Sequence, residues 1–521
     1  MIKRLVNVKI PAGKGEDELY KLVKKKAGGR LGYFRILKKS LDARDKGNIH
    51  WLYSVAYSPD KESDDKPPLE KLKNAPTVCV IGSGPSGLCC AVRLCERGYS
   101  PVILERGKSV DERTLAVDMF FSERKLDINC NVQFGEGGAG TFSDGKLNTQ
   151  TKDGYNRDIL EIFARFGAPE EILYLNKPHI GSDKLKVVLK NIRAYIEGCG
   201  GRFLFNKKFV GFDSSDSELK SVIFCDVISG EEGELPVSAA VLAVGHSARD
   251  TFRMLHDSGL YMEPRDFAVG VRVEHLSERI SFSQYGVACK LLPAADYKLV
   301  SHAHERTVFT FCMCPGGVVI PAASEDGGVV VNGMSDFARD GMNSNSALMV
   351  QLSRADFGEG LFDGMEFQRT IEERAFAAGG RTYRAPCQLF GDFARDRVSD
   401  KFGEVLPTYA AGVQFAPLSE VLPAVAVEAF KTAVPDMGRR LKGFDSADAL
   451  FTGVESRFSS PVRIVRGADR QSVSLKNLYP CGEGSGYSGG ITSSAADGIK
   501  TAEYIYNPVS YTHLTLPTIR L

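Results

Sequence analysis

The sequence lacks any apolar run that approaches the roughly 18 residues of a membrane-spanning helix. It also lacks an apolar segment after the basic residues of its start, MIKRLVNVKIPAGKGEDELY, so we expect no secretory signal and a cytoplasmic location. A large net charge is missing as well. The formal value is +1, which implies no overall attraction to nucleic acid or to membranes. The 43% of hydrophobic residues suits a globular protein with a large core.

The 12 cysteines show neither a disulfide framework nor a metal site. Four of them, within residues 79–95, lie in or beside apolar runs, where free cysteine packs as a small hydrophobic residue. The tight pair outside that region, Cys312-Met-Cys314, has no second pair and no histidines at zinc-site spacing. We therefore predict no metal site.

The first 58 residues form a separate unit in the sequence pattern. RLVNVKIP and NIHWLYSVAYS are typical of strands, and EDELYKLVKKKAG is typical of a helix that stops at glycine. Residues 59–76 combine charge with several prolines and lack apolar periodicity, which indicates a linker or a partly helical spacer. We expect a small N-terminal α+β domain over 1–58, followed by this linker.

From residue 77 the pattern is that of an α/β protein. Apolar strands that do not alternate, such as TVCVIGSG, SPVILERG and AAVLAVG, suit a parallel sheet covered on both faces. RFLFNKKFVGFD reads as one further strand, and residues 267–458 mix candidates such as FAVGVRVEHL and TVFTFCMC. We predict a Rossmann-like domain in two parts, 77–266 and 459–507, with an α+β substrate domain inserted over 267–458. Residues 508–521 continue no pattern and are expected to be a disordered or non-native tail.

A glycine motif, Gly82-x-Gly84-x-x-Gly87, follows the strand VCVI and opens the next helix. In that position Gly82 allows a tight turn, Gly84 lets a pyrophosphate approach, and Gly87 lets the helix pack closely on the strand. The helix N-terminus supplies free N–H groups and partial positive charge for phosphates. Glu105, at the end of the second strand, is placed to accept hydrogen bonds from ribose hydroxyls. The motif predicts a dinucleotide but does not separate FAD from NAD.

The segment NLYPCGEGSGYSGGITSSAADGIKTAEYI distinguishes the two cofactors. A flavin extends far past the first βαβ unit, so a distant segment must cover it. Here a strand runs into Gly482-Glu483, and Glu483 is the candidate partner of the ribityl hydroxyls. A helix beginning near Gly490-Ile491 could direct its N-terminal amides at the pyrimidine edge, where they stabilise negative charge on reduced flavin. This segment favours non-covalent FAD.

Two further segments fit an FAD domain. VQFGEGGAGTFSDGKLNT spaces four glycines between 135 and 140 before Thr141, and such a loop can form a nest of N–H groups around phosphate oxygens. AAVLAVGHSARDTF stops an apolar strand at Gly245, like strands that run under the nucleotide in two-domain flavoproteins. The four segments occur in the order expected of such proteins.

The chain resembles the uncharacterised FAD-dependent dehydrogenases, a bacterial group within the glutathione-reductase-like flavoprotein superfamily. The resemblance rests on KKSLDARDKG, VIGSGPSGL, QFGEGGAGTFSDGKL, AVGHSARDTF, AVGVRVEH, FCMCPGG and GEGSGYSGGI, and covers nearly all of residues 1–507. It implies FAD contacts at Gly82, Gly84, Gly87, Glu105, Gly138, Gly140, Gly245, Gly482, Glu483 and Ile491, with the strand around Phe209 passing the adenine ring. Neighbours within these motifs complete the expected cofactor set: Ser83, Pro85, Ser86, Arg106, Gly137, Thr141, Gly489 and Gly490.

Candidate reactive groups are few. Cys312 and Cys314 would share one face of a strand, where packing is a more ordinary role than electron relay or acid catalysis. His246 is a candidate proton donor near the cofactor, or a cap of the following helix. Arg272 could bind an anionic substrate, or could form a structural pair with a glutamate. These four side chains are the catalytic candidates.

The sequence thus predicts an FAD-dependent oxidoreductase that transfers hydride between flavin N5 and an organic small molecule. No second G-x-G-x-x-G follows a strand, so NAD(P)H would dock only transiently as an electron donor. One alternative is a flavoprotein of RNA modification, because the N-terminal unit carries a basic set: Lys24, Lys25, Lys26, Arg35, Lys38 and Lys39. Another is a non-catalytic flavin-dependent sensor. The substrate, the electron donor and the oligomeric state stay open.

Overall fold

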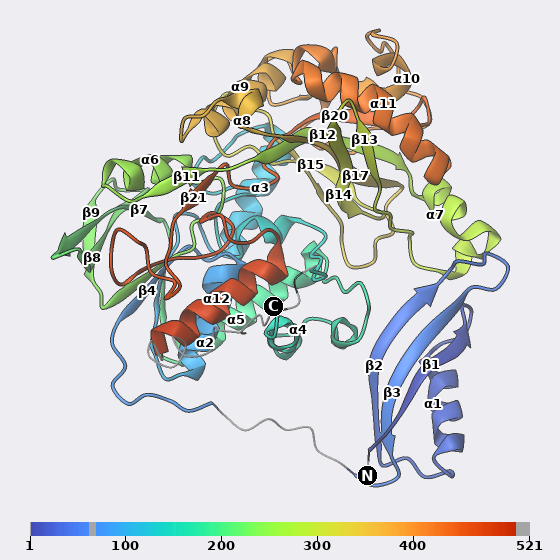
Figure 1. Cartoon of the computed structure of the whole chain (residues 1–521), viewed down its shortest axis with the longest axis horizontal. Helices are drawn as coiled ribbons and strands as arrows, with labels where there is room; N and C mark the ends of the chain where they lie inside the picture. Colours follow the sequence, from blue (N-terminus) through green and yellow to red (C-terminus); the bar gives the residue numbers. More distant parts are fainter. Residues whose placement is uncertain (1, 62–68, 150, 152, 507–521) are drawn as a thin grey trace, which may run out of the picture.

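The computed structural model describes residues 2–61, 69–149, 151 and 153–506 (Figure 1). Part of the predicted linker, 62–68, and the whole predicted tail, 508–521, lie outside the described residues. Within the described ranges, no helix is both long and apolar enough to cross a membrane.

A five-stranded sheet forms the centre of the Rossmann-like domain, and every pairing in it is parallel. Along β4, Val78 and Val80 enter one core while Cys79 and Ile81 enter another. Such strands are apolar throughout because both faces of the sheet are covered. The predicted α/β class with a parallel sheet is confirmed. The strand order is β22 (Leu478–Pro480), β10 (Ala239–Leu242), β4 (Val78–Ile81), β5 (Val102–Leu104) and β6 (Arg202–Leu204).

Helices cover one face of this sheet. They are α2 (Pro85–Glu96), α5 (Ser182–Gly198) and α12 (Ile491–Tyr506), with α4 (Asn156–Arg165) beside them (Figure 1). The remaining helical segments of this part are α3 (Val110–Glu123), η1 (Gly138–Phe142) and η2 (Glu170–Leu173). Because α2 starts directly after β4, its N-terminus lies at the carboxyl edge of the sheet.

The other face carries α6 (Arg249–Asp257) and an antiparallel sheet of β7 (Lys207–Ser215), β8 (Glu218–Asp226) and β9 (Glu232–Pro236). The prediction of one strand over RFLFNKKFVGFD is wrong. Asn206 adopts a left-handed φ of 58°, which ends β6 and turns the chain into β7 of the second sheet. Asparagine tolerates this conformation better than most residues, so it marks the break.

A seven-stranded sheet forms the centre of the inserted part. Its two long helices, α9 (Asp363–Ala378) and α11 (Ala424–Arg440), pack against the sheet (Figure 1). The strand order is β13 (Val300–Ala303), β14 (Arg306–Cys314), β17 (Asn343–Leu352), β12 (Phe267–Leu276), β20 (Leu450–Glu455), β18 (Ala385–Leu389) and β19 (Val413–Phe415). The other elements are α7 (Ser277–Tyr285), η3 (Gly286–Leu291), β15 (Val318–Pro321), β16 (Val331–Met334), α8 (Arg354–Phe357), α10 (Phe390–Phe393) and η4 (Leu418–Glu420).

The chain enters and leaves this inserted part through two adjacent strands. β11 (Met262–Pro264) pairs antiparallel with β21 (Val462–Ile464), although about 200 residues separate them. The seven-stranded sheet therefore belongs to one continuous insertion, which the chain enters and leaves at the same place.

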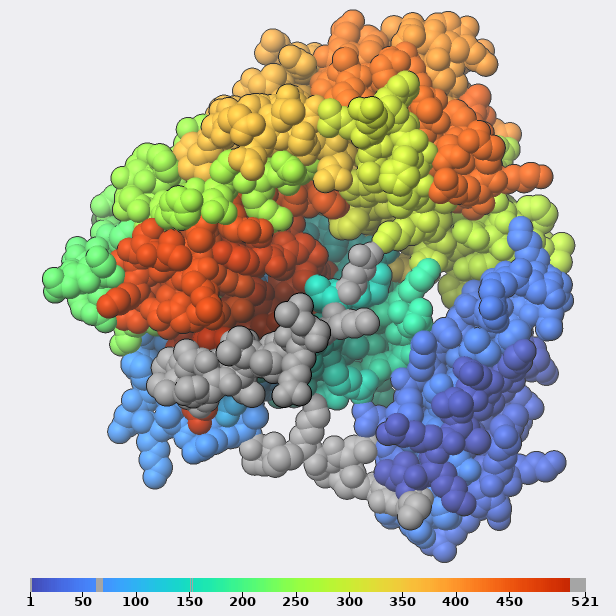
Figure 2. All heavy atoms as spheres, viewed as in Figure 1, coloured from blue at the N-terminus to red at the C-terminus, as the bar shows by residue number. Residues whose placement is uncertain are grey.

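The N-terminal residues form a sheet in the order β1 (Lys3–Pro11), β3 (His50–Ser58) and β2 (Tyr33–Asp42), with α1 (Glu16–Lys26) packed on it. This unit touches both larger parts (Figure 2). Lys39 N donates to Tyr174 O at 2.7 Å, and Lys46 Nζ donates to Ser283 O at 2.6 Å. The side chain of Lys39 turns inward to Glu16 at 2.8 Å, so Lys39 does not belong to the expected basic surface.

Candidate functional site

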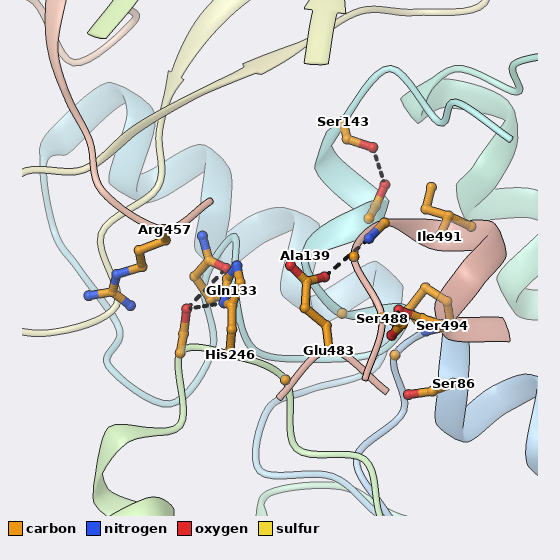
Figure 3. A pocket seen from close by; sticks show the side chains of 18 of the residues that line it. Ser86, Gln133, Ala139, Ser143, His246, Arg457, Glu483, Ser488, Ile491 and Ser494 are labelled. Atoms are coloured by element: carbon orange, nitrogen blue, oxygen red, sulfur yellow. Dashed lines mark hydrogen bonds between the residues drawn. The ribbon is translucent and has the colours of Figure 1, made fainter. Parts of the chain in front are cut away.

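A cavity of about 830 Å³ lies between the carboxyl edge of the parallel sheet and the seven-stranded sheet (Figure 3). Its lining comes from the segments after β4, β10 and β22 on one side and from β14 and the end of β20 on the other. Open parallel sheets bind their ligands at this edge, and a cavity of this size suits a small molecule or cofactor.

The turn after β4 leaves no room for side chains. Gly82 has a φ of 101°, and a Cβ atom there would lie 2.3 Å from Ala243 O. A Cβ atom at Gly87 would lie 2.0 Å from Gly82 O. The next helix, α2, has Gly84 as its N-cap and no side-chain cap, so its first N–H groups remain available to a ligand. The positive end of the helix dipole therefore faces the cavity.

A second glycine loop packs against this turn. Gly138 has a φ of 62°, and a Cβ atom there would lie 2.9 Å from Gly84 Cα. At Gly140 an added Cβ would lie 3.1 Å from Ile491 Cγ1, at the start of α12. Three segments that are far apart in the sequence thus make one continuous wall of the cavity.

Glu105 binds these loops together. Its Oε2 accepts from Ser83 N at 3.0 Å and from Ser83 Oγ at 2.6 Å, and its Oε1 accepts from Gly107 N at 2.9 Å and Gly135 N at 3.0 Å. A carboxylate offers about four acceptor positions, so the protein occupies all of them. A ligand hydroxyl can reach this carboxylate by replacing the Ser83 hydroxyl, which is the one donor of the four that can rotate away.

Beyond Glu105, one end of the cavity is aromatic and basic. The Arg106 guanidinium lies 4.3 Å from the centre of the Phe134 ring and 2.5 Å from Asp250. Lys208 binds the same aspartate at 2.7 Å. Phe209, on β7, also lines this end. A flat ring could lie here between hydrocarbon surfaces and a paired cation.

Glu483 lies at the other side of the wall. Figure 3 shows its side chain close to Ala139 and Ser488, near the start of α12. Its single hydrogen bond within the described chain comes from Gly490 N at 3.4 Å. Burial raises the pKa of this carboxyl to about 7, and the Gly490 N–H opposes that shift only weakly. Glu483 therefore has acceptor positions to offer a ligand.

Four residues of the expected cofactor set lie behind the wall. Gly87 and Gly137 permit close packing, and Thr141 is bonded to Arg113 at 3.1 Å and to Glu136 O at 3.2 Å. Gly482 N donates to Asp497 at 2.8 Å. The other members line the cavity: Gly82, Ser83, Gly84, Pro85, Ser86, Glu105, Arg106, Gly138, Gly140, Phe209, Gly245, Glu483, Gly489, Gly490 and Ile491.

His246 lines the cavity and is held by a short chain of hydrogen bonds (Figure 3). Its Nδ1 lies 2.9 Å from Ser247 Oγ, which donates to Gln133 Oε1 at 3.3 Å. Helix α6 has no side-chain cap, so the alternative role of His246 as a cap is wrong. Burial, with Arg457 and Arg249 nearby, lowers its pKa to about 4. The imidazole is therefore neutral at pH 7.

A buried ion cluster beside His246 was not predicted. Glu372, on α9, lies between Arg249 at 2.9 Å and Arg457 at 3.0 Å. Burial alone would raise the pKa of Glu372, but the two guanidinium groups outweigh it and lower the pKa to about 2. The cluster joins α6 of the Rossmann-like domain to the inserted part. No local motif announces it, because its members meet only in the fold.

The two strand cysteines stand at a bulge between Phe311 and Cys314 rather than on a regularly alternating strand. Both line the cavity; Cys312, with a left-handed φ of 40°, is exposed, whereas Cys314 is buried. Desolvation in the cavity raises the pKa of the Cys312 thiol to about 12. At neutral pH Cys312 is therefore a thiol rather than a reactive thiolate.

Arg272 forms a structural pair, so its expected alternative role as an anion clamp is wrong. The side chain is fully buried, and Nη1 lies 3.2 Å from Glu455 Oε2. Its other donors go to Asn345 Oδ1 at 3.0 Å and Cys312 O at 3.0 Å. Glu455 lines the cavity, and burial raises its pKa against the opposing effect of Arg272. The sequence reasoning missed this glutamate.

Within the described part of the chain, no group of three or more histidine, cysteine, aspartate or glutamate side chains is arranged so that it could hold a metal ion.

Comparison with known proteins shows which family the chain belongs to. Residues 266–458 match a family described as "FAD-dependent protein, C-terminal domain-like", and residues 80–110 match an NAD(P)-binding Rossmann-like domain. An uncharacterised protein of Clostridium beijerinckii is 45% identical over 495 residues, which are 90% of this chain and 91% of that protein. The chain belongs to a family of FAD-dependent proteins.

Solved flavoprotein structures are more distant. A glycerol-3-phosphate dehydrogenase from Bacillus halodurans, complexed with FAD, has 11% sequence identity and a TM-score of 0.36, over 83% of this chain and 64% of that one. A flavoprotein/dehydrogenase from Cytophaga hutchinsonii has 10% identity and a TM-score of 0.36, over 82% of this chain and 76% of that one.

The residues around the cavity fit the cofactor of this family. The uncapped α2 N-terminus provides N–H donors for a pyrophosphate. A Cβ atom at Gly245, Gly489 or Gly490 would meet no protein atom within 4 Å, so side chains there would project into the space that a ligand needs. This glycine cradle is the arrangement that close approach of a dinucleotide backbone requires.

Proposed function

We propose that this chain is an FAD-dependent oxidoreductase whose organic substrate lies against the seven-stranded sheet. The observation that carries the proposal is the single cavity that the glycine wall and the substrate side share. A cofactor bound along the wall would have its reactive end facing residues of β14 and β20. We also propose the domain limits: the FAD-binding parts are 77–266 and 459–507, the inserted domain is 267–458 and the N-terminal domain is 1–58. We further propose that the chain belongs to the glutathione-reductase-like superfamily.

Residues along the glycine wall could bind each part of FAD. Amides at the start of α2 and in the Gly138–Gly140 loop would take the pyrophosphate, and Glu105 would take the adenosine ribose. Phe209 and Arg106 would flank the adenine. Glu483 would accept from the ribityl hydroxyls, and the amides that open α12 would face the pyrimidine edge. When bound, the flavin supplies two-electron chemistry through N5, with hydride passing to or from the substrate.

The chain's own side chains set the surroundings of that chemistry. The inserted part closes one side of the cavity and so limits water near the substrate. His246 is neutral and fixed by Ser247, so it can exchange a proton without a change of position. Cys312, as a thiol of raised pKa, contributes bulk rather than electron relay. NAD(P)H is proposed only as a transient donor, because the Rossmann motif occurs once in the sequence.

The test starts with the colour of the purified protein. We expect a yellow protein that releases FAD on denaturation, and anaerobic bleaching of the bound flavin by NADH, NADPH or a reduced metabolite. A colourless protein that also fails to bind added FAD would overturn the proposal. Bound FAD that no donor reduces and no acceptor reoxidises would favour the sensor alternative. Salt-sensitive RNA binding that disappears on removal of residues 1–58 would favour RNA modification.

A further inference from the structure

The substrate side of the cavity carries an aromatic wall. The rings of Phe311 and Phe458 meet edge to face with centres 4.5 Å apart, and Phe309 adjoins Phe458 at 5.5 Å. Phe311 is 37% exposed, although it lies on a central strand pair. All three rings line the cavity. Exposed aromatic rings on a concave surface bind apolar, flat ligands more favourably than water.

The cations deepest in this region already have partners. Arg272 is bound by Glu455 and Asn345, and Arg457 donates to Glu372, Glu325 and Ser324. Lys146 lies 2.9 Å from Asp144 and also donates to Met313 O. Lys298 has no such partner within the described chain, but it is exposed at the rim. The interior therefore offers no ready site for a carboxylate or phosphate group.

Glu455 is the acceptor that remains. Its Oε2 faces Arg272, while Oε1 has no hydrogen-bond partner among the described residues. The residue is only 7% exposed, and its side chain borders the cavity. Oε1 is not among the fully buried atoms that lack a partner, so a hydrogen-bond donor on a ligand in the cavity can reach it. Arg272, the partner of Glu455, donates to Cys312 O in the bulge, and Phe311 of the aromatic wall directly precedes that bulge.

We infer that the substrate is an uncharged aromatic compound bearing an O–H or N–H group, with its ring against Phe311 and Phe458 and its donor toward Glu455. This inference rests on the proposed function, because it assigns the substrate class of the same cavity. Arg272 acts as a positioning residue: it holds Oε2 and leaves Oε1 to the ligand. An aliphatic dicarboxylate has no ring to pack on Phe311 and Phe458, and its carboxylates would meet no free cation in the interior of the cavity.

Binding of small probes to the FAD-loaded protein tests the inference. The probes are phenol, anisole, cyclohexanol and benzoate, followed by the change in flavin absorbance and by calorimetry. We expect phenol to bind about tenfold more tightly than anisole, which has no donor, and than cyclohexanol, which has no aromatic ring. Benzoate should bind more weakly than phenol. Equal affinities for phenol and cyclohexanol, or preferred binding of benzoate, would overturn the inference.

Two variants separate recognition from stability. In Glu455→Gln, Arg272 should keep the amide oxygen, which leaves the NH₂ group toward the ligand, so the preference for phenol over anisole should disappear. In Phe458→Leu, phenol affinity should fall about fivefold or more. Phe282→Leu is the matched control, since Phe282 lies on α7 and is exposed outside the cavity. An unchanged phenol-to-anisole ratio in the folded Glu455→Gln protein would exclude the proposed donor contact.

These outcomes are distinct from failure of the proposed function. A protein that holds no FAD contradicts the proposed function before any probe is added. A yellow protein that is reduced and reoxidised but ignores phenol contradicts the substrate class alone.

Discussion

Gly498 of α12 touches Ser86 of α2 so closely that a Cβ atom at position 498 would lie 2.0 Å from the Ser86 carbonyl oxygen. The contact fixes the two helices whose N-termini open toward the cavity. Gly498→Ala should therefore push them apart, with a loss of about 1–3 kcal/mol in the free energy of unfolding and weaker retention of FAD. Thermal unfolding and the FAD content of the purified protein measure both effects.

The control for this change is Gly198→Ala at the end of α5. A Cβ atom there meets nothing within 4 Å, and the residue is already helical. We expect no loss of stability or a gain of about 0.5–1 kcal/mol. Equal effects at both positions would show that the close contact of α12 with α2 is unimportant.

Glu105→Gln should weaken FAD binding roughly 10–100-fold. The carboxylate receives four hydrogen bonds from Ser83, Gly107 and Gly135, and an amide NH₂ group would face at least one of these donors. Titration of FAD into cofactor-free protein, followed by flavin fluorescence, gives the dissociation constant. Glu112→Gln, on the exposed face of α3, should leave that constant unchanged. Unaltered affinity in Glu105→Gln would reject its role in organising the wall.

Glu372→Gln should destabilise the protein by about 3–5 kcal/mol, because Arg249 and Arg457 would remain buried without a counter-charge. The stabilising effect of this carboxylate, whose pKa is lowered to about 2, is complete above the ordinary glutamate pKa and is lost as the pH falls through 2. The neighbouring Glu373 is exposed, so Glu373→Gln should change stability by less than about 0.5 kcal/mol. Denaturant unfolding at pH 7 compares the pair.

Stability should fall between pH 6.5 and pH 4, in part through His275. This buried histidine bonds Phe444 O through Nε2 at 2.8 Å, and burial lowers its pKa from 6.5 to about 4. The unfolded chain takes up the proton first, so acid favours unfolding over this range. In His275→Gln the melting temperature should be lower at pH 7.5 but should drop less steeply toward pH 5. His302→Gln, at an exposed site on β13, should keep the steepness of the original protein.

The glycine wall could be predicted from the sequence because its geometry is local. Gly82, Gly84 and Gly87 are needed wherever a strand, a tight turn and a helix meet, and their spacing carries that requirement. The wall residues around Gly138 and Gly490 were likewise found from their own loops. What the sequence could not give is Glu105 as a fourfold acceptor, because its donors come from three separate segments.

The misses have equally specific causes. The bulge at Cys312 inserts one residue, so the regular alternation used to place the two thiols does not hold at that point of β14. A glutamate partner for Arg272 could be expected from the sequence, but its identity could not. Glu455 lies on β20, which is distant in the sequence and comes beside Arg272 only because β20 pairs with β12.

The glycine turn at Gly82–Gly87 and the start of α12 line one cavity but lie far apart in the sequence, so they are synthesised at different times. In chain order the segment after β4 comes first, then the whole insertion, and after it the segment from β22 to α12 that completes the central sheet. Chains fold from the N-terminus as they emerge, so the parallel sheet must wait for its last edge strand. A chain cut short before residue 478 would have a phosphate turn but nothing to face it. Under the proposed function, such a truncated chain should hold no FAD and should lack the yellow colour.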